Sequence, residues 1–298
     1  NRKGRATYEP NSLRLGPRED PLAGYVSFAA PPVEGPRARL RPESFADHYS
    51  QARLFYRSQS EIEQQHIADA LIFELGKCEM TELRSRMVAH LLNIDDTLAG
   101  DVAAGLGLRQ MPDPATPARD LPPSPALSMM SRAPCSFTGR PLVILLDDGF
   151  DRDLLGEMEA LVQEEGGRIR TICMVVGGTQ AGDGSLVRGD HALRSGKSVL
   201  FDAVAVLSGA DGADVLARHP VAVAFLTDAH NHGKFIGHHG ANALFAAAGL
   251  AVGDEGHIDL GEKGGPRQFL EKCRALRLWA RLSALPREAD MAAMTPPP

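Results

Sequence analysis

The stretch LVILLDDG, residues 142–149, decides the fold of the larger part of this chain. Five apolar residues in a row that end at two aspartates and a glycine are typical of a strand buried on both faces of a parallel sheet. A helical apolar period follows over 154–162, and a second apolar strand follows over 169–176. Alternating strands and helices of this kind predict a parallel sheet with helices on both faces.

Two more apolar runs, 203–207 and 221–226, predict further strands, and a helical period over 269–282 predicts a closing helix. The fold class expected for residues 142–285 is therefore α/β, a flavodoxin-like parallel sheet sandwich. Residues 286–298 end in three prolines and are expected to form a loose tail.

Three amphipathic helices are expected before this part, within residues 46–108. Ser60 and Glu63 have the spacing of a capping box, which satisfies free backbone N–H groups where a helix begins. Apolar residues then recur at helical spacing in two successive segments, and a third, shorter helix runs from near Asp96 to near Gly105. The recurring residues are Ile67, Leu71, Leu75 and Cys78, and then Leu83, Met87, Leu91 and Ile94. The prediction is a small all-α helical domain.

Proline dominates the segment between these helices and the first strand. Eight prolines lie in residues 109–141. Each removes a backbone donor and restricts its neighbour, so this segment is predicted to be an extended linker. Residues 1–45 are rich in proline, glycine and arginine without a sustained period, and they are predicted to form an extended arm.

The composition is that of an ordinary globular protein, with 43% apolar and 23% charged residues among 298. A net charge of −6 gives no reason to expect nucleic-acid binding. The four cysteines lie far apart without a CxxC pair, which favours a reduced, cytoplasmic compartment. No apolar stretch reaches membrane-spanning length, so neither a membrane partner nor a secretory leader is expected. Because Asn1 rather than Met comes first, we expect the chain to begin within a longer protein or to be processed.

Two segments resemble a known family. Residues 8–12 read YEPNS, and residues 47–75 read DHYSQARLFYRSQSEIEQQHIADALIFEL. Together they are similar to the end of the haem barrel and the following helical domain of monofunctional haem catalases. Helices followed by a proline-rich linker and a flavodoxin-like domain resemble the large-subunit class of that family. The resemblance implies that 1–45 is the arm after the barrel and that 46–108 is the catalase helical domain.

The resemblance also implies a function for the parent protein, the conversion of hydrogen peroxide to water and oxygen at haem. The distal His and Asn and the proximal Tyr of such catalases lie upstream of the segment that begins at Tyr8. The expectation is therefore that this chain carries no catalytic, cofactor-binding or metal residue and binds no haem alone. Its partners would be the haem domain of the same polypeptide and the other subunits of a homotetramer, with roles in assembly, stability and the access channel. The alternative is a chaperone-like or ligand-binding α/β module without catalysis.

Two motifs invite other assignments. The run Arg53–Tyr56 resembles the pattern around the proximal tyrosine of catalases, but its arginine stands three residues before the tyrosine rather than four. The interpretation is a structural aromatic pair. Residues 191–198 resemble a phosphate-binding loop whose first glycine is replaced by His191, and Val199 to Phe201 favour a strand where such a loop needs a helix. A surface turn is expected.

Four histidines lie close together in the sequence: His230, His232, His238 and His239. Imidazoles bind zinc and copper well, but no cysteine or carboxylate pair at ligand spacing completes a site. Residues at i and i+2 point apart on a helix, and glycines alternate with the histidines. The expectation is a solvated, histidine-rich loop, with adventitious metal binding as the alternative.

The α/β part is also similar to the class I glutamine amidotransferase and intracellular protease families, which place a nucleophilic Cys at a strand-to-helix elbow. The segment compared is 220–230, which holds no cysteine. Thr227 and His230 lie within one turn, which leaves a weak hydrolase as an open alternative. The expectation is that the fold is kept without its chemistry, and that Cys173 is an inert thiol in a buried strand.

Overall fold

The computed structural model describes residues 31–32, 34–36, 38–108, 111–113, 118–132 and 135–283. The chain divides into two compact units, Asn1–Ala46 and Asp47–Pro298. Among its described residues the first unit holds a 3-10 turn, η1 (Glu43–Ala46). The arm expected over 1–45 lies mostly outside the described residues, and the tail expected over 286–298 lies wholly outside them.

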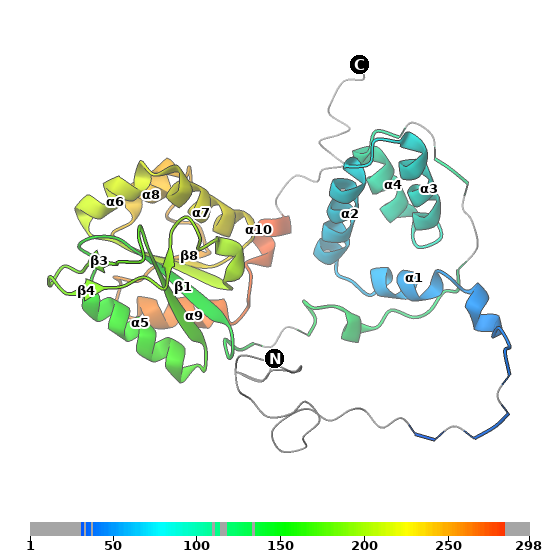
Figure 1. Cartoon of the computed structure of the whole chain (residues 1–298), viewed down its shortest axis with the longest axis horizontal. Helices are drawn as coiled ribbons and strands as arrows, with labels where there is room; N and C mark the ends of the chain where they lie inside the picture. The colour runs from blue at the N-terminus through cyan, green and yellow to red at the C-terminus, as the bar shows by residue number, and fades with distance from the viewer. Residues whose placement is uncertain are drawn as a thin grey trace. The chain divides into compact units, whose positions relative to one another are not determined.

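The second unit begins with four α-helices (Figure 1), which are α1 (Ser50–Arg57), α2 (Glu61–Gly76), α3 (Thr81–Leu91) and α4 (Asp96–Gly105). The three helices expected from the sequence are confirmed as α2, α3 and α4, whereas α1 was not anticipated. The capping box is present at the start of α2, where the Ser60 side chain and the Glu63 side chain each bond the other's backbone N–H. Residues such as Val88, Leu98 and Val102 are buried between the helices.

The proline-rich segment does not hang free where the structure describes it. We call residues 118–132 the strap, because they lie along α1 and α2 and include a 3-10 turn, η2 (Pro125–Leu127). The backbone N–H of Arg119 donates to the Ser50 hydroxyl at 2.8 Å, and that of Ser124 donates to the Ser58 hydroxyl at 2.8 Å. Backbone N–H groups of the linker therefore bind it to serine side chains of the helical part.

Glu63 makes the densest of these contacts. Its carboxylate accepts the Ser60 N–H at 2.9 Å, the Ser128 hydroxyl at 2.8 Å, and the N–H groups of Met129 and Met130 at 2.8 and 3.1 Å. Burial by itself raises the pKa of Glu63, but the hydrogen bonds from Ser60, Ser128 and Met130 outweigh it and lower the pKa to about 2. One ionised side chain thus caps α2 and holds the end of the strap.

The α/β part is built on a six-stranded sheet in the order β5-β2-β1-β6-β7-β8, and every neighbouring pair is parallel. A short antiparallel hairpin stands beside this sheet. The strands of the sheet are β1 (Pro141–Leu146), β2 (Arg168–Cys173), β5 (His191–Ala192), β6 (Ala203–Leu207), β7 (Ile236–His239) and β8 (His257–Asp259), and those of the hairpin are β3 (Thr179–Gln180) and β4 (Leu186–Val187). The expected α/β fold with a flavodoxin-like parallel sheet is confirmed.

Helices cover both faces of the sheet (Figure 1). In β1, Leu142, Ile144 and Leu146 face α5 and α9, while Val143 and Leu145 face α7 and α8. Because side chains alternate along a strand, an unbroken apolar run supplies two cores at once. The helices are α5 (Arg152–Glu164) and α9 (Gly265–Cys273) on one face, α6 (Ala210–Ala217), α7 (Pro220–Asn231) and α8 (Asn242–Ala247) on the other, and α10 (Trp279–Ser283) near the end.

Two sequence predictions about helices and strands after residue 203 are wrong. The strand expected over 221–226 is the first half of α7, because a short apolar run does not distinguish a strand from a buried helix. Pro220 occupies the first helical turn, where its missing N–H costs nothing. The single helix expected over 269–282 is divided into α9 and α10, since Leu276 between them takes a left-handed φ of 71°.

Candidate functional site

The strand order places a topological switch point between β1 and β6. From β1 the chain moves to one side, through β2 and β5, and then returns to β6 on the other side of β1. In open α/β sheets the loops that leave the carboxyl ends of the two strands at such a point diverge, and ligands bind in the crevice between them.

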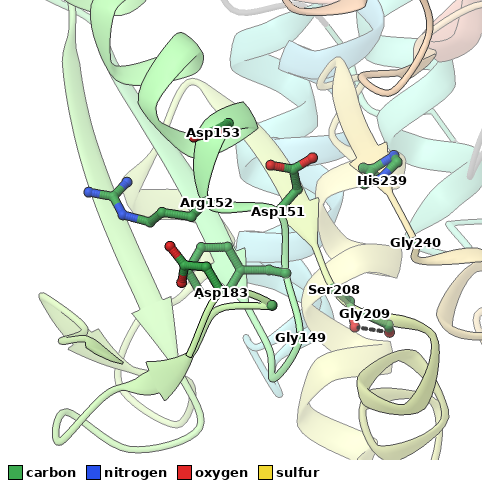
Figure 2. Close-up of a pocket in the computed structure, with 11 residues that line it drawn as sticks. Gly149, Asp151, Arg152, Asp153, Asp183, Ser208, Gly209, His239 and Gly240 are labelled. Carbon is green, nitrogen blue, oxygen red and sulfur yellow. Dashed lines mark hydrogen bonds between the residues drawn. The ribbon is translucent and has the colours of Figure 1, made fainter. Parts of the chain in front are cut away.

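A cavity of about 460 Å³ lies at this crevice. Figure 2 shows the residues that line it, which come from loops far apart in the sequence. The loop after β1 contributes residues 149–153, and the β3–β4 hairpin contributes Gly182 and Asp183. Ser208 and Gly209 follow β6, and His239 and Gly240 stand at the end of β7.

The wall formed by the β3–β4 hairpin is held by Asp148. Its carboxylate accepts the Thr179 hydroxyl in a short hydrogen bond and the Gln180 N–H at 3.0 Å. The bond from Thr179 lowers the pKa of Asp148, whereas burial raises the pKa of its neighbour Asp147. One oxygen of Asp147 is buried without a hydrogen-bond partner. Asp148 therefore ties the carboxyl end of β1 to the hairpin.

Close backbone contact shapes the floor of the cavity. Gly149 has a φ of 79°, and a Cβ there would lie 3.3 Å from the Gly209 Cα. The Gly209 N–H donates to the Asp148 carbonyl at 3.1 Å. At the end of β7, Gly240 has a φ of 67° and lies against the Ser208 carbonyl. Glycine is required at these turns because larger residues rarely adopt such φ values and would not fit.

The lining is rich in carboxylates. Asp151 caps α5 by accepting the Leu154 N–H at 3.0 Å, and Asp183 accepts the Ser185 N–H at 2.8 Å. The Ser208 hydroxyl donates to the Gly209 carbonyl at 2.9 Å, as the dashed line in Figure 2 marks, so its proton is engaged with the backbone. The described lining thus offers polar groups for a small molecule with hydrogen-bond donors.

The residues suggested by the phosphate-loop motif lie elsewhere. His191 belongs to the edge strand β5, and the strand expected over 199–201 is wrong, because η3 (Ser198–Leu200) is a single 3-10 turn. A Cβ on Gly196 would clash with the Ile172 side chain, so this glycine serves packing. A phosphate loop leads directly into an α-helix, which is absent at this described position.

The hydrolase alternative also fails on geometry. Thr227 lies inside α7 and not at an elbow, and its hydroxyl donates to the Val223 carbonyl at 2.9 Å. His230 is turned toward His257. Cys173 is fully buried, and burial raises its pKa to about 11, which fits an inert core thiol.

The expectation of a solvated histidine-rich loop is wrong for two of the four residues. His230 lies in α7 and His238 lies in β7, where it is 3% exposed. His232 fits the expectation, because it is exposed and donates to the Asp228 carbonyl at 2.8 Å. His239 is half-exposed at the end of β7, 3.9 Å from Asp259.

A side-chain cluster that the sequence did not indicate joins His230 to His257 and Asp254. His230 Nδ1 lies 3.1 Å from His257 Nε2, and Asp254 Oδ1 lies 3.9 Å from the same nitrogen. Burial lowers the pKa of both imidazoles and so favours their neutral form. Asp254 and His257 are three positions apart in the sequence, but His230 lies 24 positions before Asp254, so local spacing does not indicate the cluster.

The aromatic pair in α1 is divided between the core and the surface. Tyr56 is 5% exposed, whereas Phe55 is 47% exposed. Arg53 donates to the Ile94 carbonyl at 2.9 Å and to Asp120 of the strap at 2.7 Å. These contacts support the structural interpretation of this run.

The helices and the α/β part both match known proteins. A family model described as "Catalase-related immune-responsive" matches residues 42–106, the range of α1 to α4. Catalase C of Rhizobium meliloti (strain 1021) is 47% identical over 284 residues, which are 93% of this chain and 40% of that protein. The chain is related to the C-terminal part of the large catalases. The catalase-related match covers the helices, and the catalase C match continues through the α/β part.

Other large catalases show the same relation. Catalase HPII of Mycobacterium avium is 37% identical over 83% of this chain and 35% of that protein. Catalase HPII of Pseudomonas aeruginosa is 36% identical over 95% of this chain and 41% of that protein. The chain thus spans about two fifths of the length of these catalases. Among the residues that the structure describes, no helix is both long enough and apolar enough to cross a membrane.

Proposed function

We propose that this chain works as the C-terminal part of a haem catalase subunit. In that subunit a separate haem domain converts hydrogen peroxide to water and oxygen. The observation that carries the proposal is the 47% identity with catalase C over 93% of this chain. This C-terminal part then serves assembly, stability and the route by which peroxide reaches the haem.

The surface of the helices supports a role in assembly. Four large apolar residues of this part are exposed by 42–63%: Phe55, Phe73, Met80 and Leu83. Apolar side chains on so small a helical part lose contact with water when another part of the protein covers them. In the proposed subunit the haem domain and neighbouring subunits of a cytoplasmic homotetramer cover them.

Haem belongs to the other part of the proposed subunit. The family resemblance puts the distal His and Asn and the proximal Tyr before Tyr8, so the residues of this chain supply no ligand to the iron. We expect the isolated chain to show no saturable one-to-one Soret complex with haemin and no sustained oxygen release from peroxide. A one-to-one complex with catalytic turnover would overturn this part of the proposal.

The cavity at the switch point favours a second role, the binding of a small polar ligand by the α/β part. Its position at the carboxyl ends of β1 and β6 and its polar lining are those of a ligand site in this class of sheet. Such a role accompanies the catalase assignment and does not replace it. Ligand binding that persists in the assembled subunit would support it.

A chimera tests the main proposal. The segment of Rhizobium meliloti catalase C that this chain matches is replaced by residues 1–298, and the product is compared with catalase C truncated before that segment. We expect the chimera to recover the subunit assembly, thermal stability and oxygen release that the truncated protein lacks.

The control is a second chimera that carries an unrelated flavodoxin-like domain after the same truncation. If this control recovers assembly as well as the chimera with residues 1–298 does, a general covering effect explains the result and the proposal fails. A chimera that remains as inactive and unassembled as the truncated catalase would also overturn it.

A further inference from the structure

The cluster of His230, Asp254 and His257 lies at the end of the sheet opposite the switch-point cavity. His257 is the first residue of β8, and His230 stands one residue before the end of α7. The loop before β8 supplies Asp254. All three residues therefore meet at the amino ends of the strands. The proposed function assigns no role to residues at this end of the sheet.

The three side chains offer ligand atoms at the spacing of a metal centre. One nitrogen of each histidine and one carboxylate oxygen lie within 4.8 Å of one another. His230 Nδ1 and His257 Nε2 are 3.1 Å apart. Two imidazole nitrogens at about 2.0–2.1 Å from one tetrahedral zinc ion would lie about 3.3 Å apart. A movement of a few tenths of an ångström brings the pair to that separation.

The surroundings fix which nitrogen of His257 is available. His257 Nδ1 lies 2.7 Å from the Ala251 carbonyl, which can only accept, so Nδ1 carries the proton. In the neutral ring Nε2 then holds a lone pair directed at the cluster. A ligating histidine whose other nitrogen donates to a backbone carbonyl is the usual arrangement in metal sites. His230 Nδ1 carries the proton of the present hydrogen bond, and this proton passes to its Nε2 when a metal binds.

The carboxylate is oriented in the same way. Asp254 Oδ1 accepts the Gly256 N–H at 2.8 Å and forms a short ion pair with Arg281, whose side chain is 8% exposed. Hydrogen bonds to a ligating carboxylate fix its position, although the guanidinium charge opposes a cation. A site for a divalent ion therefore needs further negative charge nearby.

That charge is present in a cavity beside the cluster. A hollow of about 400 Å³ is lined by Asp254 and His257 together with Glu255, Asp259 and Glu262. Lys272 is the one Lys or Arg in its described lining. With Arg281, the four carboxylates face two cationic groups. A cleft with excess negative charge raises the local concentration of cations and gives the ion a path to the histidines.

We propose that His230, Asp254 and His257 form a binding site for a divalent transition metal ion of the zinc type. Imidazole nitrogens favour zinc, cobalt and nickel over magnesium and calcium, which prefer oxygen. Two histidines and one carboxylate leave a fourth position open to water or to a small ligand from the acidic cavity. The proposal does not depend on the catalase assignment.

The test is titration of the full chain with Zn²⁺ by calorimetry and with Co²⁺ by its visible absorption. We expect one saturable site without the thiolate charge-transfer band that a cysteine ligand would give. His257→Gln and His230→Asn should each weaken binding by at least about 100-fold, since even outer partners of metal ligands contribute 10–100-fold. His232→Asn is the matched control, because His232 is exposed at the end of the same helix, and it should leave the affinity unchanged.

A second measurement needs no variant. In imidazole NMR spectra of the unaltered chain, Zn²⁺ should shift the signals of His230 and His257 and leave those of His232 and His239 in place. Binding with equal affinity in the His257→Gln variant would overturn the proposal. Imidazole signals of His230 and His257 that stay unmoved at saturating Zn²⁺ would overturn it as well.

Discussion

The helices α1 to α4 and the α/β part bury apolar residues to different extents. Among the residues that the structure describes, ten buried apolar residues form the core of the helices, whereas the two faces of the sheet hold cores of twenty and sixteen. The helices add polar fastenings, with Glu63 holding the strap, while β1 is buried on both faces by apolar contact alone.

The difference shows which part is complete in itself. The free energy gained by burial grows with the apolar area removed from water, and small domains bury a smaller share of their surface. We therefore expect the α/β part to fold without a covering partner. The helices expose Phe73 and Met80, rely on the strap, and gain most from a covering partner. This contrast is what the proposed place in a catalase subunit requires.

The largest effect is expected from a substitution that creates a cavity in the core of the sheet. Phe269 in α9 is fully buried between the helix and the sheet. Phe269→Ala should lower the free energy of unfolding of the α/β part by about 3–5 kcal/mol, because it removes contacts and leaves a void. Urea unfolding followed by circular dichroism measures this.

The control for that variant is Val215→Ala, since Val215 is 49% exposed in α6. It should change the stability little. If Phe269→Ala destabilised the helices at 50–105 as much as the sheet, the two parts would unfold as one unit. The claim that they differ in stability would then be wrong.

A smaller effect is expected from the charged end of the strap. Glu63→Gln removes the carboxylate that accepts the Met129 and Met130 N–H groups, which should cost about 1–3 kcal/mol in the helical part. Hydrogen exchange over 118–132 and 50–76 should rise while the sheet stays protected. Glu61→Gln, an exposed change in the same helical turn, is the matched control.

The same contact predicts a pH dependence. The pKa of Glu63 is lowered from 4.5 to about 2 in the folded chain. Its stabilisation is therefore present above pH 4.5 and is lost as the pH falls toward 2, because the unfolded chain takes up the proton first. The strap should loosen in this acid range in the unaltered chain, and Glu63→Gln should not show that step. Equal acid loosening in both proteins would contradict the assignment.

A third change acts on the wall of the switch-point cavity. Asp148→Ala removes the acceptor for Thr179 and Gln180. It should lower the free energy of local opening of the hairpin by about 1 kcal/mol. Exchange of amides in 179–187 should then rise about fivefold. Asp153→Ala, which changes another lining carboxylate and leaves the contacts of Asp148 with the hairpin in place, is the control. An unchanged hairpin would show that other contacts hold it.

The smallest effect is expected from the exposed ion pairs of the strap. Asp120 pairs with Arg53 and Arg57 at 2.7 Å, but its side chain is 71% exposed. Exposed pairs of this kind contribute little. Asp120→Asn should leave the urea midpoint within experimental error. A loss as large as that of Glu63→Gln would show that the strap depends on surface charge rather than on the buried carboxylate.

The sequence predicted what depends on local pattern. The apolar run 142–146 and the capping box at Ser60 carry their structural meaning within a few residues. The run over 221–226 failed because its helical contacts, with Phe225 and Leu226 on the buried side, depend on what packs against it. Strands as short as β7 and β8 hold too few residues to show a period.

The candidate sites were beyond the sequence for a related reason. His230 meets His257 because the β7–β8 pairing brings distant segments together. The switch-point cavity depends on the strand order, since the loops after β1 and β6 meet only when these strands are neighbours. Glu63 shows the limit most clearly. Its spacing from Ser60 predicted the cap, while its bond to Ser128, 65 positions along the chain, had no local signal.

Hydrogen exchange followed by mass spectrometry tests the central claim most directly, on the isolated chain and on the catalase C chimera. In the dilute isolated chain we expect slow exchange in the strands and helices of 141–273 and fast exchange over 50–105. In the chimera the helices at 50–105 should become as protected as the sheet, because the haem domain covers their exposed apolar side chains. Equal protection of the helices in the isolated chain, with no gain in the chimera, would contradict the account.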